Sequence, residues 1–199
     1  MFYFLSSFLV VFILAFILFM VFIRKMKPET FKRLCEKKVR RFAKRNDLLC
    51  IEKLNIENFQ RENIELDHVI FGKKYIYVIS DSLLHGFVKG EANDNSWVYY
   101  NVVTKKPEYT TNLNNLSMQN IQEFAGILGI NSDPIIAICV VPNECDFSVK
   151  DLENDKVVIV HYSSLNKKIK EFEKRNIGTL NEKQIYVQYS TIKERNEKF

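Results

Sequence analysis

The sequence lacks the short motifs that identify several large enzyme classes. It has no glycine-rich phosphate loop, no Gly-x-Ser-x-Gly elbow and no His-Glu-x-x-His segment, which excludes sites of the P-loop, α/β-hydrolase and zinc-protease types. Its three histidines, His68, His85 and His161, do not share a metal-ligand spacing. Its four cysteines form no Cys-x-x-Cys pair and no regular framework, which is typical of a protein in a reducing compartment.

Charged residues are absent from positions 2–23, a continuous run dominated by Phe, Leu, Ile and Val. About 20 such residues in a helix span the ~30 Å hydrocarbon core of a membrane. A cleaved signal peptide would have a basic start, a shorter apolar stretch and a small-residue cleavage site, and none of these is visible. The run therefore predicts an uncleaved transmembrane anchor. Because basic residues follow the run but none precedes it, we expect a single-pass protein of the cell membrane, with its N-terminus outside and residues 28–199 in the cytoplasm.

The net charge of +5 conceals a strong asymmetry along the chain. Residues 24–45 contain 11 Lys or Arg and two Glu, whereas residues 46–199 have a balance of −4. Within 24–46 the apolar residues recur at helical spacing, which predicts a basic juxtamembrane amphipathic helix. Basic side chains near a membrane are attracted to anionic lipids by about 1 kcal/mol each. The expected lipid-binding residues are Arg24, Lys25, Lys27, Lys32 and Arg33. Nucleic-acid binding is the alternative for the same charges.

The remaining pattern predicts one mixed α/β domain over residues 47–175 and a helical segment over residues 176–199. We expect a hairpin around residues 72–74. The expected strands are 48–56, 64–71, 75–79, 134–141 and 157–160, with 87–89 and 97–103 continuing the same sheet. Residues 104–113 are expected to form a loop. The expected helices are one from Ser117 to Gly129, one from about 163 to 175, and one over 182–195.

One stretch resembles a known family. Leu66-Asp67-His68 lies on one expected strand, a second apolar strand covers residues 75–79, and Gly86, Gly90 and Trp97 follow. This order is similar to that of the nuclease-related domain (NERD) family, which belongs to the restriction-endonuclease-like PD-(D/E)xK fold and often occurs beside transmembrane helices. The segment 115–120 (NLSMQN) resembles the family's Asn-Pro-Leu-x-Gln-Asn segment, with Leu116 in place of proline. The resemblance covers roughly residues 30–170.

The resemblance implies an α/β protein in which the N-terminal transmembrane helix is followed by one restriction-endonuclease-like domain, with a mixed central sheet flanked by helices. It also implies phosphodiester hydrolysis, in which carboxylates hold Mg²⁺ or Mn²⁺ and a lysine organises the nucleophile. By resemblance, Asp67 and Glu36 are the metal ligands and Gln119 is an auxiliary polar group. The family's Glu-x-Lys positions fall on Ser80 and Ser82, whose neutral hydroxyls replace neither charge.

Three functional hypotheses follow. The leading one is a membrane-anchored, cytoplasm-facing NERD-like domain that has lost catalysis, needs no cofactor, and binds or scaffolds a protein partner or a nucleic acid. The second is an active nuclease with Mg²⁺ or Mn²⁺ and a displaced acid, either Glu65 or Asp81. Strand alternation would point Asp81 to the opposite face unless a bulge redirects it. The third is an adaptor for anionic lipid surfaces.

Overall fold

The structure is a computed structural model. It describes residues 13, 14, 16, 28–57, 63–84, 86–101, 104–150, 155–176 and 178–196. The prediction of a transmembrane helix is contradicted, because no helix within these residues is both long and apolar enough to cross a membrane. The run 2–23 itself lies outside the described residues apart from Ile13, Leu14 and Phe16.

The same finding contradicts the predicted single-pass membrane location. The longest described helix is α2 (Pro28–Arg45), with 18 residues. Its exposed face is strongly basic, and each charged side chain at the centre of a membrane helix costs several kcal/mol. The fold class is therefore corrected to an α/β protein with mixed sheets, in which no helix of the described ranges is able to cross a membrane.

A five-stranded mixed sheet forms the centre of the molecule, as the sequence predicts. Its strands are β1 (Leu49–Glu57), β2 (Asn63–Phe71), β3 (Ile76–Asp81), β7 (Ile135–Val141) and β9 (Val157–His161). They lie in the order β1-β2-β3-β7-β9. The first three are antiparallel to one another, and β7 and β9 continue parallel to β3. Strand β7 is buried at all seven positions, as expected of a central strand covered on both faces.

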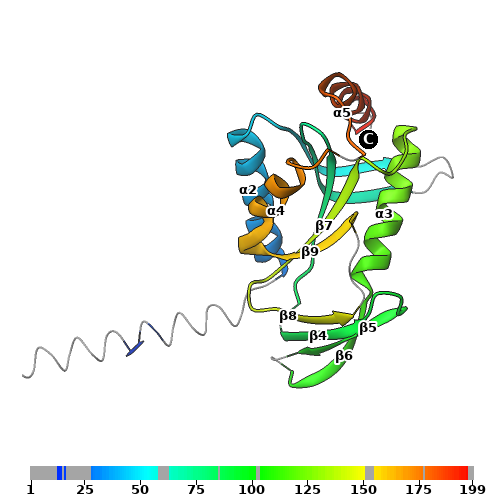
Figure 1. Ribbon diagram of the computed structural model, residues 1–199. Coiled ribbons are helices and arrows are strands. Elements are labelled where there is room, and N and C mark those ends of the chain that lie inside the picture. The colour runs from blue at the N-terminus through cyan, green and yellow to red at the C-terminus, as the bar shows by residue number, and fades with distance from the viewer. Residues whose placement is uncertain are drawn as a thin grey trace, which may run out of the picture.

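Helices cover both faces of this sheet (Figure 1). Helices α2 and α4 (Leu165–Phe172) pack on one face, and α3 (Leu113–Leu128) and α5 (Glu182–Asn196) pack on the other. The buried stripe of α2 consists of Phe31, Cys35, Val39 and Phe42. This three-to-four-residue spacing places all four on one side of the helix. Burying a side chain such as Phe31 contributes about 1.5–3 kcal/mol.

A second sheet of four strands lies below the first in Figure 1. It contains β4 (Gly86–Glu91), β5 (Ser96–Asn101), β6 (Lys106–Thr111) and β8 (Asp146–Lys150), in the order β6-β5-β4-β8. The prediction that residues 87–89 and 97–103 continue the central sheet is therefore wrong. The free edge of β3 pairs with β7 in parallel register, so no edge remains for β4. The predicted loop over 104–113 is also wrong, because it contains β6.

Helix α3 begins four residues before the predicted cap at Ser117. Its actual N-cap is Asn112, whose side-chain oxygen accepts from the backbone N–H groups of Asn114 and Asn115 at 2.9 and 3.2 Å. The Asn112 amide also donates to the carbonyl oxygen of Ala92 at 2.9 Å. The same buried side chain therefore begins the helix and joins it to the second sheet. The predicted end at Gly129 is confirmed, with φ 65°.

Candidate functional site

A pocket of about 360 Å³ lies where β2, β3, β6 and α3 meet. We call it the β2–β3 pocket. The polar residues that line it include Glu65, Asp67, Ser80, Asp81, Ser82 and Asn120. It therefore contains Asp67 and both serines at the family's Glu-x-Lys positions.

Strand pairing brings these residues together. In the β2–β3 hairpin His68 pairs with Ile79. Asp67 and Ser80 therefore lie one residue further from the hairpin turn, toward its open end. On its other side β3 pairs with β7, where Asp81 lies beside Val140. The Ser82 backbone N–H donates to the Val140 carbonyl oxygen at 2.9 Å. The carboxyl end of β3 is thus held in regular register, without the bulge that the relocated-acid hypothesis invoked.

Asp67, one of the residues that line this pocket, forms an ion pair with α2. The Lys32 ammonium of α2 donates to Oδ1 of Asp67. The Asp67 hydrogen bond is the largest cause of the raised pKa of Lys32, and the charges of Asp81 and Glu65 add to it. The expected lipid-binding role of Lys32 stays a prediction, and in the structure its ammonium contacts Asp67 inside the domain. Of the other four expected lipid-binding residues, Arg33 is exposed, and Arg24, Lys25 and Lys27 lie outside the described residues.

Asp81 lies within electrostatic reach of this pair. Burial, followed by the charge of Asp67, raises the pKa of Asp81 from its ordinary 3.8 to about 6, while Lys32 opposes the rise. Its Oδ1 atom is buried and has no hydrogen-bond partner in the part of the chain that the structure describes. The neighbouring Ser80 hydroxyl instead bonds Cys139. The charges of Asp67 and Asp81 both act on Lys32 and Cys35 of α2, so the two carboxylates both lie near α2.

Two predicted site residues are engaged elsewhere. Glu36 accepts a hydrogen bond from Arg40 at 2.9 Å, and the same guanidinium donates to Glu52 at 2.6 and 2.5 Å. Gln119 is exposed and donates to Glu123 at 2.7 Å, while its neighbour Asn120 lines the pocket. Glu36 therefore does not join Asp67 in the pocket.

His68 is buried beside the site, with 1% exposure. Neither ring nitrogen has a hydrogen-bond partner within the described residues. Burial lowers the pKa of His68 against the opposing charges of Asp67 and Glu52. The ring is therefore neutral at physiological pH and packs as a core side chain.

Lys32 is the site residue that the sequence analysis missed. The signal was available, since Lys32 and Glu36 are four residues apart and so lie on one side of a helix. The helix pattern alone does not show which strand packs against that side of α2. Lys32 was therefore grouped with the other basic residues of 24–46 and not with Asp67.

The residues present do not fit a Mg²⁺ or Mn²⁺ ion. Such hard cations take oxygen ligands, with Mg²⁺ requiring octahedral geometry. Here the Lys32 ammonium already bonds Asp67. Across the described ranges, no group of three or more His, Cys, Asp or Glu side chains is arranged to hold a metal ion.

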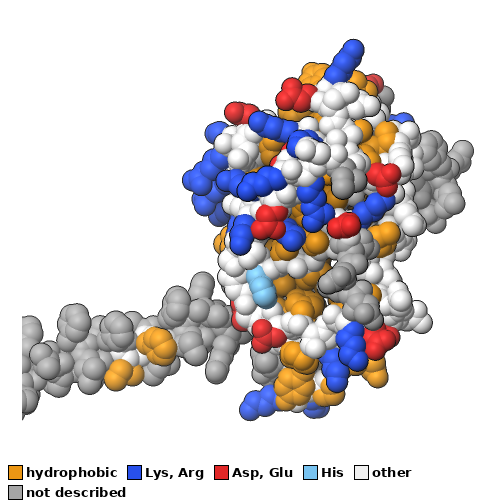
Figure 2. Space-filling view, in the orientation of Figure 1, with side chains coloured by type: hydrophobic (Ala, Val, Ile, Leu, Met, Phe, Trp, Pro, Cys, Tyr) orange, Lys and Arg blue, Asp and Glu red, His pale blue; other side chains and the backbone are white. Residues whose placement is uncertain are grey.

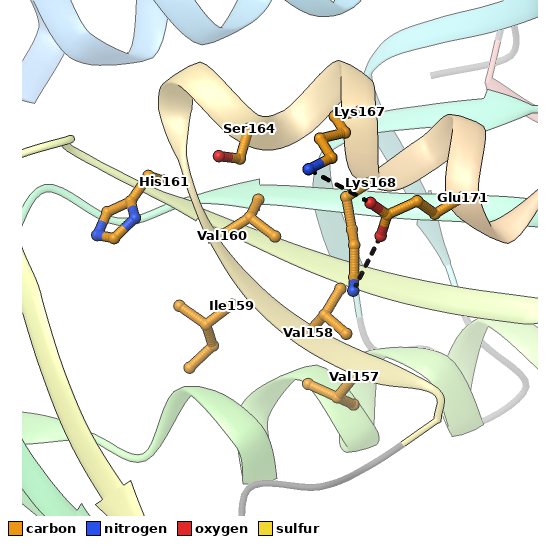
Figure 3. Close-up of a pocket in the computed structure, with 9 residues that line it drawn as sticks. All are labelled: Val157, Val158, Ile159, Val160, His161, Ser164, Lys167, Lys168 and Glu171. Carbon is orange, nitrogen blue, oxygen red and sulfur yellow. Dashed lines mark ion pairs between the residues drawn. The ribbon is translucent and has the colours of Figure 1, made fainter.

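A second hollow, of about 390 Å³, lies along the edge strand β9 beneath α4 (Figure 3). The charged side chains that line this hollow form ion pairs with one another: Lys167 and Lys168 pair with Glu171 at 4.0 and 3.4 Å. It contains none of the predicted site residues. The β2–β3 pocket therefore remains the candidate site.

No protein-family model, curated protein or solved structure matches the chain. The resemblance to the NERD family therefore stays a prediction from the motifs quoted above.

Proposed function

We propose that the domain is a nuclease-like fold that has lost catalysis and serves as a binding or scaffolding module. The observation that supports this most directly is the ion pair between Lys32 and Asp67. The acid that the resemblance assigns to the metal is bonded to an ammonium group.

The end of β3 supports the same proposal. Metal-dependent phosphodiester hydrolysis needs clustered negative charge for the cation and a positive group for the developing charge on the phosphate. Ser80 and Ser82 supply neither. The half-buried Ser80 hydroxyl is also engaged with the buried Cys139 thiol.

Manganese binding tests this proposal. Mn²⁺ is titrated calorimetrically into the full chain, with Asp67→Ala as the control, and cleavage of single-stranded and duplex DNA and RNA is assayed in the same buffer. We expect neither saturable binding nor cleavage. Saturable binding and cleavage that are both lost in Asp67→Ala would overturn the proposal.

One observation favours a second candidate, an active nuclease with a relocated acid. Oδ1 of Asp81 has no partner in the described chain and lies near the charge of Asp67. A cation bound to both carboxylates would have to displace Lys32. This candidate predicts that Asp81→Asn abolishes Mn²⁺ binding as completely as Asp67→Ala does.

A further inference from the structure

A basic groove of about 610 Å³ lies between α2 and α4. We call it the α2–α4 groove. Its cationic residues are Lys37, Lys38, Arg41 and Arg45 of α2 and Lys170 of α4. No carboxylate is among its lining residues. Lys and Arg side chains gather over these two helices in the space-filling view (Figure 2).

The cations of the groove differ from those on the other side of α2. Lys32 and Arg40 each pair with a carboxylate, Asp67 and Glu52 respectively. The groove residues Lys37, Arg41, Arg45 and Lys170 form no ion pair within the described residues. The domain thus neutralises one basic face of α2 internally and leaves the other unpaired.

The same contrast holds on α4. Lys167 and Lys168, which line the hollow along β9, both pair with Glu171. Lys170, which faces α2, has no such partner in the described chain. The unpaired cations of two helices therefore converge on one hollow, although the two helices are more than 100 residues apart in the sequence.

Leaving these charges unpaired is unfavourable for the empty protein. Lys37, Arg41 and Arg45 follow one another at four-residue intervals, a spacing at which like charges destabilise a helix by about 0.2–0.5 kcal/mol per pair. Lys38 adds a partly buried ammonium that donates to the Tyr162 carbonyl oxygen and lies 4.1 Å from the Tyr162 ring centroid. An anion in the groove would remove this repulsion.

The shape and charge of the groove indicate the class of anion. Guanidinium groups bind phosphate oxygens in a bidentate manner, and lysines add point charges. We propose that the α2–α4 groove binds a compact, multiply charged oligophosphate group, such as the polyphosphate of a nucleotide. Its volume lies in the range of small-ligand sites.

Two larger anionic partners fit less well. A flat membrane surface would leave a concave site unfilled, because its cations converge on a hollow. A long nucleic acid would meet repulsion beyond the groove, since residues 46–199 have a balance of −4. The oligophosphate site goes beyond the function proposed above and does not depend on it, because it shares no residue with the β2–β3 pocket.

Calorimetric titration of tripolyphosphate into the full chain tests the site. The test variant is Arg41→Ala/Arg45→Ala, and the matched control is Arg33→Ala/Lys44→Ala, which removes two exposed cations of the same helix that do not line the groove. We expect saturable binding by the unaltered chain and the control. In the test variant we expect affinity to fall about tenfold or more, because both bidentate donors are lost.

Folding does not confound this test, because both arginines are exposed and alanine favours the helix. The thermal unfolding midpoint of the unliganded test variant is expected to stay equal or to rise as repulsion is removed.

Three results would overturn the proposal. The first is the absence of saturable tripolyphosphate binding, and the second is an equal loss of affinity in both double variants. The third is binding of a single-stranded oligonucleotide, or of vesicles containing phosphatidylserine, that tripolyphosphate does not compete away. That result would assign the groove to a nucleic acid or to a membrane instead.

Discussion

Lys32 of α2 and Asp67 of β2, 35 residues apart in the chain, form an ion pair at the open end of the β2–β3 hairpin. The sequence assigns these two residues to different functions, one to lipid binding and the other to a metal. In the structure the two side chains instead pair with each other. This ion pair also sets the electrostatic environment of Asp81, since the two charges shift the pKa of Asp81 in opposite directions.

Replacement of Lys32 by glutamine tests this coupling. Because the Lys32 charge lowers the pKa of Asp81, we expect Lys32→Gln to raise that pKa further above about 6. Carbon-detected NMR titration of the aspartate carboxyl groups measures the change. Arg33→Gln, which removes an exposed neighbouring charge, is expected to leave Asp81 unaffected. A fall in the Asp81 pKa in Lys32→Gln would contradict the structure.

Asp81→Asn is expected to stabilise the protein at pH 7. The folded-state pKa of about 6 lies above the ordinary 3.8. Between these two pH values the folded chain therefore holds a proton on Asp81 that the unfolded chain has released. Stability therefore falls as the pH rises from about 4 to about 6. Removing the half-buried charge should recover about 1 kcal/mol at pH 7, after allowance for solvent screening.

Urea unfolding at pH 4, 5, 6 and 7 measures this effect. The advantage of Asp81→Asn should grow with pH across this window. Asp146→Asn, an exposed carboxylate of β8, serves as the control. A variant that is less stable than the parent chain at pH 7 would show that Asp81 makes a favourable contact as an anion.

His68→Leu is expected to reduce the sensitivity of the fold to acid. Burial lowers the pKa of His68 from its ordinary 6.5, so the unfolded chain binds a proton that the folded chain does not. This contribution to stability is present above pH 6.5 and is lost as the pH falls below it. The leucine variant should lose less stability than the parent chain between pH 6.5 and pH 5.

The same variant should keep its stability at pH 7.5, because it removes two buried nitrogens that have no partners within the described chain. Chemical unfolding at both pH values measures the difference. A marked loss of stability at pH 7.5 would indicate that His68 has a polar partner in the folded protein.

Gly90→Ala is expected to destabilise the second sheet. A Cβ atom at Gly90 would lie 2.3 Å from Cδ1 of Trp97, whose side chain is fully buried and donates to the Glu91 carbonyl oxygen at 2.8 Å. Forcing the indole to move should cost about 1–3 kcal/mol.

Gly126→Ala is the matched control. Gly126 is an exposed position within α3, and a Cβ atom there would meet nothing within 4 Å. We expect this variant to gain about 0.5–1 kcal/mol, because alanine loses less backbone entropy in a helix. Urea unfolding of both variants distinguishes the two effects, and equal changes would contradict the packing of Trp97 against Gly90.

The elements that the sequence predicts well are those with a strong apolar pattern. The buried run in β7 and the stripe on α2 belong to this group. The strands β6 and β8 were missed because each is short and largely exposed. The alternation of β8 is limited to two apolar residues, Phe147 and Val149, which is too short a pattern to predict a strand. Strand β8 depends on pairing with β4, about 60 residues earlier.

The sequence by itself determined the local features of this protein. These include the amphipathic face of α2, the turn at the β2–β3 hairpin and the glycine that ends α3, because each depends on residues only a few positions apart. Tertiary structure alone decided which charges pair between different helices and strands. Lys32 and Lys37 lie on the same helix and have the same charge, yet one pairs with Asp67 and the other lines an acid-free groove. The difference arises from which strand or helix packs against each side of α2, and that arrangement depends on contacts distant in the sequence.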